Sequence, residues 1–366
     1  MPVTRAPKGR VIINIIPLII SIITFCFVRY SLSHPEAVEK YYSSGIYPEI
    51  AGVISFFSAM VPVSLWDIFW IGLSLFLITG IILVMLKRLS PGLYILRFAQ
   101  MAAIFYSLFY LTWGFNYFRP PMEKRLGWIT PKLSDKEFRV VLDSLIAGTN
   151  RNYIATDYSD FPEIEQSIED SYHTLSHQLG LSWPGGTRTP KKILISSLFA
   201  KSGISGYFGP LFNEVHINHY QLPEDYAFTL AHEKAHQFGF ANEAEANMAA
   251  FIACTGSSDK RTRYSGYMQI MLYFLEDAQQ LSDYHSFIRK IDDDVIHDLR
   301  FRKSYYDNLR NRTIEKFQDS ANNAYLKTQH IERGIKNYNQ VVSLIMSWYM
   351  FSGQIMPVTP DPLAVK

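Results

Sequence analysis

The sequence predicts an α+β fold that is mainly α-helical, with N-terminal transmembrane helices followed by a helical domain that holds a small β-sheet. Three observations support this prediction. Three long, uncharged, apolar runs occupy the first third of the 366 residues. The remainder repeats apolar residues at helical spacing over several long stretches. Two short segments, 191–196 and 213–218, instead have the character of strands.

The first third, residues 1–118, is predicted to be a membrane domain. Its uncharged runs cover approximately residues 11–28, 68–86 and 98–118. Each run is long enough to cross a bilayer core of about 30 Å. The first run could also be the apolar part of a signal peptide, since basic residues precede it. No small-residue cleavage site follows it, so we favour a retained transmembrane helix.

The basic residues predict the orientation in the membrane. Lys87 and Arg88 lie in the short loop between the second and third runs, and the N-terminus is also basic. Both therefore belong in the cytoplasm, and two crossings separate them, so the two assignments agree. The third crossing then places the rest of the chain on the extracytoplasmic side. Arg119, Lys124 and Arg125 are a weaker opposing signal, because a long domain can translocate despite flanking charge.

Two aromatic or apolar segments border the predicted spans. Residues 50–61, within the outer loop 31–67, are apolar but too short to span. They could form an interfacial or re-entrant helix, or a helix packed on the outer domain. The aromatic run from Trp113 to Arg119 resembles the belt found at membrane interfaces, and the two prolines that follow it end the helix.

Residues 119–356 are predicted to form the outer domain, and the proline-rich tail 357–366 is expected to be loose. Helical spacing or start signals occur in the ranges 134–150, 162–181, 263–281, 288–325 and 334–348 and in a helix that begins at residue 223. A glycine-rich loop, 203–210, precedes the strand 213–218. That strand alternates, so His216 is expected to face solvent or a cleft.

Composition excludes some functions. The formal net charge is only +2 and no basic arm is visible, so nucleic acid is not an expected partner. There are two cysteines, Cys26 in an apolar run and Cys254 in the outer domain. They provide neither a disulfide framework nor a zinc ribbon.

The chemistry is concentrated in His232-Glu233-Lys234-Ala235-His236, an H-E-x-x-H pentad. Residues four apart share one face of a helix, so the two imidazoles can hold one Zn²⁺ with Glu233 beside them as general base. A random chain of this composition would contain such a pentad about once in a hundred cases. Apolar residues before the pentad and Gly239 after it predict a packed helix that ends at the glycine.

A catalytic zinc ion needs a third protein ligand and an open position for water. The pattern H-E-x-x-H-x-x-G-x-x-H would place a third histidine at position 242, which is Asn242, so that pattern fails. Asn242 is instead a suitable N-cap for a second helix that starts with Glu243 and Glu245. We favour Glu243 as the third ligand because Asn247 follows one turn later as an amide partner for the site. Glu245 remains the alternative third ligand. His216 is also a possible ligand.

The pentad and the segment Asn242-Glu-Ala-Glu-Ala-Asn247 resemble the gluzincin branch of the zincin metallopeptidases. In that branch a glutamate on the following helix is the third ligand, and an acid often lies four residues later; here that position is Asn247. The chain also resembles an uncharacterised family of bacterial integral-membrane proteins grouped with the zincins. The likeness includes Trp113-Gly-Phe-Asn-Tyr-Phe-Arg119, the Gly-Ile-Ser-Gly-Tyr-Phe loop and Tyr264-Ser-Gly-Tyr267. The resemblance implies a zincin-like fold in a bacterial cytoplasmic membrane protein.

We therefore predict a membrane-anchored zinc hydrolase, most simply a peptidase, with a peptide or protein substrate and the lipid bilayer as partners. The metal ligands are His232, His236 and Glu243, and Glu233 is the general base. His216 and several tyrosines, including Tyr267 and Tyr338, could stabilise the oxyanion. A non-enzymatic membrane protein with a structural or degenerate zinc site is the alternative, and a helical scaffold with a chance pentad is a third reading. The polar flanks of the pentad exclude an intramembrane protease.

Overall fold

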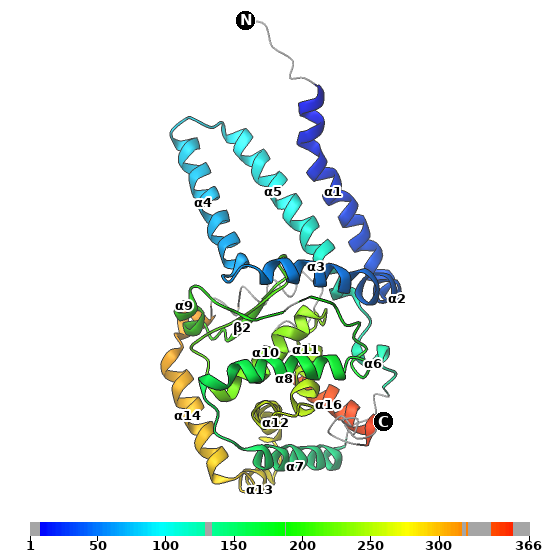
Figure 1. The fold of residues 1–366 in the computed structure, drawn as a ribbon, viewed down its shortest axis with the longest axis vertical. Helices are drawn as coiled ribbons and strands as arrows, with labels where there is room; N and C mark the ends of the chain where they lie inside the picture. Colours follow the sequence, from blue (N-terminus) through cyan, green and yellow to red (C-terminus); the bar gives the residue numbers. More distant parts are fainter. Residues whose placement is uncertain (1–7, 129–133, 187, 317–319, 321–337, 354–366) are drawn as a thin grey trace, which may run out of the picture.

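The computed structural model confirms the predicted fold class: the protein is α+β and mainly helical, with apolar helices near its N-terminus. The structure describes residues 8–128, 134–186, 188–316, 320 and 338–353. Three long helices extend from one side of a larger helical body, and the short sheet lies in that body near the helices' base (Figure 1). The predicted loose tail, 357–366, lies outside the described residues.

Three described helices are long and apolar enough to cross a membrane. They are α1 (Lys8–Ser33), α4 (Leu65–Met85) and α5 (Pro91–Thr112). Helix α5 begins and ends earlier than the predicted span 98–118. It begins early because Ser90 caps it by accepting a hydrogen bond from the Leu93 amide at 3.3 Å, and proline occupies its first turn. It ends early because the chain turns into the 3₁₀-helix η2 (Gly114–Phe118).

A bent helical segment lies between the membrane helices and the outer body (Figure 1). It consists of α2 (Pro35–Ala37), the π-helix η1 (Val38–Ile46) and α3 (Tyr47–Ala59). One face of α3, including Tyr47, Ala51 and Ser55, is buried, and its opposite face exposes Val53 and Phe56. The buried face agrees with the reading of 50–61 as a helix packed on the outer domain, and the interfacial reading stays a prediction for the exposed apolar face.

The outer body is a helical core around α11 (Glu243–Thr255), which is buried along almost its whole length. Around it pack α8 (Phe161–Thr174), α10 (Pro223–Gln237), α12 (Lys260–Ala278) and α16 (Tyr338–Ser352), and α7 (Asp135–Asn152) packs on α12 and α16. Shorter elements are α6 (Met122–Arg125), η3 (Tyr158–Asp160), α9 (Ser196–Lys201) and α13 (Tyr284–Ile288), and α14 (Asp293–Leu309) runs along one side (Figure 1). The predicted domain limits at 118 and 356 stay predictions.

The sheet has three short strands in the order β1-β3-β2. Strand β1 (Lys191–Lys192) is parallel to β3 (Glu214–Ile217), and β2 (Gly206–Gly209) is antiparallel to β3 with Tyr207 opposite His216. The glycine-rich segment expected to be a loop therefore contains an edge strand, because β3 pairs with it. The strand predicted over 191–196 is shorter, since α9 begins at Ser196. Strand β3 is buried throughout rather than half-buried.

Candidate metal centre

Helix α10 carries His232, Glu233 and His236 through the middle of the outer body. It starts with a proline and two acids in its first turn, as the helix dipole favours. It ends before Gly239, whose φ of +90° is strained for residues with a Cβ atom. The chain then reverses and enters α11, which packs closely against α10.

Helix α11 begins at the residue that brings a carboxylate to the two histidines. The Asn242 side chain accepts hydrogen bonds from the amides of Ala244 at 2.8 Å and Glu245 at 3.2 Å, so it caps the helix as predicted. Glu243, in the first turn, places Oε2 3.3 Å from His232 Nε2 and 3.6 Å from His236 Nε2. The two Nε2 atoms are themselves 3.1 Å apart.

The far nitrogens of both imidazoles are fixed by hydrogen-bond acceptors. His232 Nδ1 lies 2.9 Å from Asn247 Oδ1, and His236 Nδ1 lies 2.7 Å from the carbonyl oxygen of Phe240. A carbonyl oxygen only accepts, so each Nδ1 carries the hydrogen. In the neutral imidazoles both Nε2 atoms then present lone pairs to each other and to the Glu243 carboxylate. Three electron-pair donors converge on one point, which is the arrangement a cation requires.

The spacing of these donors fits a tetrahedral metal ion. Ligands about 2.0–2.1 Å from a tetrahedral centre are separated from one another by roughly 3.3–3.4 Å. The separations of 3.1, 3.3 and 3.6 Å bracket that value. His232, His236 and Glu243 thus form a group that could hold a metal ion. The Glu243 side chain is 40% exposed and that of His232 16%, so solvent reaches this cluster.

The electrostatics of the cluster also favour a cation at its centre. Burial alone would lower the pKa of His236, but the carboxylates of Glu243 and Glu233 outweigh it and raise that pKa to about 9. In return the two imidazoles hold the pKa of Glu243 well below its usual range, against the effect of burial. The cluster thus stabilises positive charge at its centre, which a proton or a metal ion can supply.

Glu233 lies beside the cluster with the environment expected of a general base. Its side chain is almost fully buried, and burial raises its pKa although the two histidines oppose this. A Cβ atom on Gly206 would come within 3.0 Å of Glu233 Cγ, so strand β2 approaches this glutamate closely. Glycine at position 206 is what permits that approach.

The other candidate ligands lie elsewhere among the described residues. Glu245 accepts a hydrogen bond from the Met122 amide at 2.9 Å and pairs with Arg125 at 2.8 Å. His216 is fully buried rather than facing solvent or a cleft, and its Nε2 lies 2.8 Å from Ser64 Oγ. Tyr267 is buried against Gly148 and Phe251 in the core. The side chain of Tyr338 lies outside the described residues.

The C-terminal end of α10 is held by residues from the membrane-side segments. Tyr47 donates its hydroxyl to the carbonyl of Gln237 at 2.7 Å, and the Trp113 indole donates to the carbonyl of His236 at 2.8 Å. These bonds satisfy carbonyls that a helix end leaves without partners. The aromatic segment 113–119 was predicted as an interfacial belt, but Trp113, Phe115 and Phe118 are buried inside the protein. The one sequence signal for a role inside the protein is that the segment 113–119 is among the features shared with the uncharacterised membrane family.

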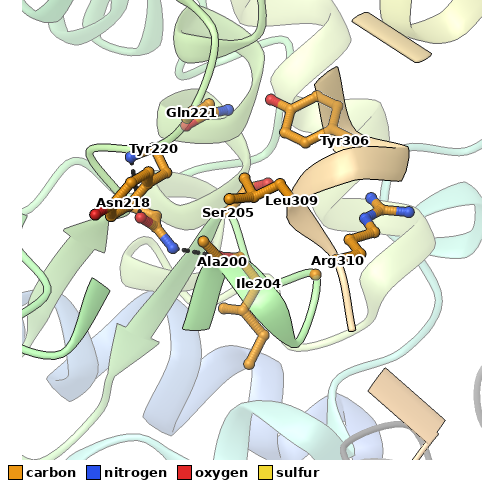
Figure 2. Close-up of a pocket in the computed structure, with 10 residues that line it drawn as sticks. Ala200, Ile204, Ser205, Asn218, Tyr220, Gln221, Tyr306, Leu309 and Arg310 are labelled. Carbon is orange, nitrogen blue, oxygen red and sulfur yellow. Dashed lines mark hydrogen bonds between the residues drawn. The ribbon is translucent and has the colours of Figure 1, made fainter. Parts of the chain in front are cut away.

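A hollow at the start of β2 is the second feature near the site (Figure 2). It lies between that strand and the end of α14, where the Asn218 amide donates to the carbonyl of Ile204 at 2.9 Å. Its volume is about 10 Å³, enough for no more than about one water molecule. The hollow is too small for a substrate, so the partly exposed cluster is the better candidate for chemistry.

Comparison with known proteins supplies a family but no activity. The family model described as a protein of unknown function (DUF3810) matches residues 42–346, which include both membrane helices α4 and α5 and the whole cluster. No curated protein and no solved structure shows a significant match.

Proposed function

The chain belongs to the DUF3810 family of proteins of unknown function, and from its metal-ligand cluster we propose that it is a membrane-anchored, zinc-dependent hydrolase, most simply a peptidase. The observation that carries the proposal is the convergence of His232 Nε2, His236 Nε2 and Glu243 Oε2 within 3.1–3.6 Å of one another. Two imidazoles and one carboxylate are a common ligand set of catalytic zinc sites.

The residues divide the work of amide hydrolysis. A bound Zn²⁺ supplies Lewis-acid chemistry, lowering the pKa of water and polarising the scissile carbonyl. Glu233, with its raised pKa, accepts the proton that water releases as its oxygen bonds to the carbonyl carbon. The same carboxyl then donates that proton to the amine as the carbon–nitrogen bond breaks. His232 and His236 keep their orientation through Asn247 and the Phe240 carbonyl.

Strand β2 provides a place for an extended peptide. Within the described sheet, β2 pairs with β3 on one side only, and pairing of a peptide with its other edge is the mode of binding that we propose. The close approach of Gly206 to Glu233 brings that edge beside the proposed base. A peptide added to β2 would therefore pass the cluster.

The proposed location is the extracytoplasmic side of a bacterial cytoplasmic membrane. The loop between α4 and α5, which contains Lys87 and Arg88, lies at the opposite end of the membrane helices from the outer body (Figure 1). The positive-inside tendency assigns that loop to the cytoplasm and the cluster to the outside.

A non-enzymatic protein with a closed, structural zinc site is the less supported alternative. A closed site needs a fourth protein ligand, and Glu245 and His216 were the candidates. Glu245 is engaged by Arg125, and His216 is engaged by Ser64. The partial exposure of Glu243 leaves room for water at the fourth position.

Substitution of the base tests the proposal. Full-length protein in lipid nanodiscs is assayed with a library of quenched fluorescent peptides, and metal content is measured in parallel. We expect Glu233→Gln to retain the metal and to lose hydrolysis by about 10²–10⁴-fold, the range for a general base. Glu276→Gln, an exposed acid near the end of α12, is the control for charge loss. Equal rates for wild type and Glu233→Gln would remove Glu233 from its role.

A further inference from the structure

An apolar cavity of about 520 Å³ lies between the membrane helices α4 and α5. Its α4 wall is formed by Phe69, Trp70, Leu73 and Leu77, one face of the helix, and its α5 wall runs from Phe98 to Tyr110. Trp70, Phe98 and Ala102 in these walls remain exposed, so the cavity opens sideways. Both helices are candidate membrane spans, so that opening faces lipid.

The two ends of the cavity differ. Toward the α4–α5 loop, Tyr94 packs on Gly80 so closely that a Cβ atom would clash, and its hydroxyl donates to the carbonyl of Leu77 at 3.1 Å. These contacts close that end. At the other end the wall residue Phe109 packs against Trp113, with ring centroids 6.0 Å apart. The cavity thus ends blindly in the membrane and extends toward the outer body.

Trp113 connects the outer end of the cavity wall to the helix that carries two of the candidate metal ligands. Trp113, which contacts the wall residue Phe109, lies 6.4 Å from the His236 ring and donates to the His236 carbonyl. It also packs against Phe208 of the edge strand β2 at 5.5 Å. A single tryptophan therefore separates the cavity wall from both a metal ligand and the proposed peptide-binding strand.

Apolar side chains are exposed around this end of the cavity. Helix α3 exposes Phe56, Phe57 and Met60, and the segment leading into α9 exposes Leu194 and Ile195. Both elements lie where the membrane helices meet the outer body (Figure 1). Exposed apolar patches of this kind are typical of surfaces that contact a membrane. The surface of the outer body nearest the membrane helices is therefore suited to contact with lipid.

The size and lining of the cavity select its occupant. A helix about 10 Å wide needs roughly 400 Å³ for each 5.4 Å turn, so the cavity admits little more than one turn. The wall from Phe98 to Tyr110 spans about 18 Å, or more than three turns. At about 30 Å³ for each non-hydrogen atom, the cavity instead holds about 17 such atoms, which matches one long acyl chain. Its apolar lining also offers little to a polypeptide backbone.

We propose that the cavity between α4 and α5 binds the acyl chain of a lipid-modified substrate, so that the attached peptide lies along β2 at the metal centre. The substrate class is thus a lipid-anchored peptide or protein that is cleaved close to its lipid anchor. This inference rests on the proposed hydrolase function. Binding energy from the remote acyl chain would then be used to position the scissile bond.

The first experiment compares two peptides in full-length protein reconstituted in phosphatidylcholine nanodiscs. A quenched fluorescent peptide that the protein cleaves is tested with and without an N-palmitoyl group. We expect the palmitoyl peptide to have a kcat/KM about tenfold or more above that of the plain peptide. Ala102→Trp, which fills the cavity, should lower the ratio of the two kcat/KM values to about one. Ile104→Trp, on an exposed position of α5 outside the cavity lining, should keep it and so controls for partitioning into the bilayer.

The second experiment needs no catalysis. An N-palmitoyl peptide with a diazirine at the end of its chain is photo-cross-linked to the Glu233→Gln protein, and the labelled residues are mapped. Labels on Leu73, Met101 and Ala102 that excess unmodified palmitoyl peptide displaces support the acyl site even if no peptide is hydrolysed. Labels spread evenly over lipid-facing residues, or displaced only by a transmembrane-helix peptide, overturn it. Hydrolysis without a palmitoyl preference would leave the proposed function standing and remove the acyl site.

Discussion

Two clusters that combine histidine with glutamate lie close to the sheet, and they differ in where their positive charge comes from. In the metal-ligand cluster, His232, His236 and Glu243 turn three electron-pair donors toward a common point. In the second, buried cluster, Glu214 and His216 on β3 meet Lys191 on β1, whose ammonium group bonds directly to the Glu214 carboxylate. One cluster could take a cation from outside, and the other contains its own.

The surroundings of the two clusters follow this difference. Glu214 and His216 have fully buried side chains, and the Glu214 carboxylate also accepts from the amides of Leu65 and Trp66 at the start of α4. Lys191 makes two further hydrogen bonds, to the carbonyls of Ser58 and Val63. This buried cluster therefore fastens a membrane helix to the sheet. The metal-ligand cluster is partly exposed. A histidine and a glutamate alone do not distinguish the two uses; the third partner and the exposure do.

The largest expected effect in the buried cluster comes from removing its cation. Lys191→Met leaves the Glu214 charge buried without its partner, and we expect a loss of about 3–5 kcal/mol in the free energy of unfolding. Thermal or denaturant unfolding of the full-length protein in nanodiscs measures it. Lys192→Met removes an equivalent charge from the exposed neighbouring position and should change the stability by less than about 0.5 kcal/mol. Equal losses in the two variants would contradict the role of Lys191 as the buried partner of Glu214.

In the metal-ligand cluster, the metal affinity should depend on the hydrogen bond between His232 and Asn247. Asn247→Ala frees His232 Nδ1 from its acceptor, so the imidazole loses its fixed orientation. We expect the metal affinity to fall about 10–100-fold, the usual effect of such partners, with little change in the fold. Competition with a metallochromic chelator measures the affinity. The exposed Asn308→Ala is the control. An unchanged affinity for Asn247→Ala would show that Asn247 does not position the ligand.

A smaller effect, on the free energy of unfolding rather than on metal affinity, should appear when Glu214 is protonated at low pH. Burial would raise the pKa of Glu214, but its bonds from His216, Lys191 and the Trp66 amide outweigh burial and lower it. A lowered folded-state pKa adds stability above the unfolded value of about 4.3, and that stability is lost as the pH falls through the folded value. Unfolding measured from pH 7 to pH 3 should therefore show the difference between wild type and Glu214→Gln shrinking below about pH 4. A constant difference would contradict this.

The fold class and much of the site could be predicted because their signals are local. Uncharged runs of membrane length, the helical spacing of the outer body and the Asn242 cap each depend on neighbouring residues, and the structure agrees with them. The geometry that separates Glu243 from Glu245 also follows from the cap, since the first turn of α11 turns only one of them toward α10. Their role in binding metal stays a prediction.

The rest depended on contacts between distant residues. His216 alternates as a solvent-facing residue would, but the Tyr207 ring stacks on it, and Ser64, at the start of a membrane helix far away in the sequence, lies 2.8 Å from its Nε2. The glycine-rich segment becomes strand β2 only because β3 pairs with it. Trp113 has the composition of an interfacial residue, yet it packs under α10 and donates to the His236 carbonyl. Periodicity contains no information about such partners.

The metal content of full-length protein purified without added metal tests the central claim most directly. Elemental analysis should find about one zinc ion per chain in the wild type and a loss of that zinc in His236→Ala and Glu243→Ala. Glu245→Ala should keep it, since Glu245 pairs with Arg125 rather than with the histidines. Wild-type protein without stoichiometric metal, or His236→Ala protein that binds as much metal as wild type, would contradict the account.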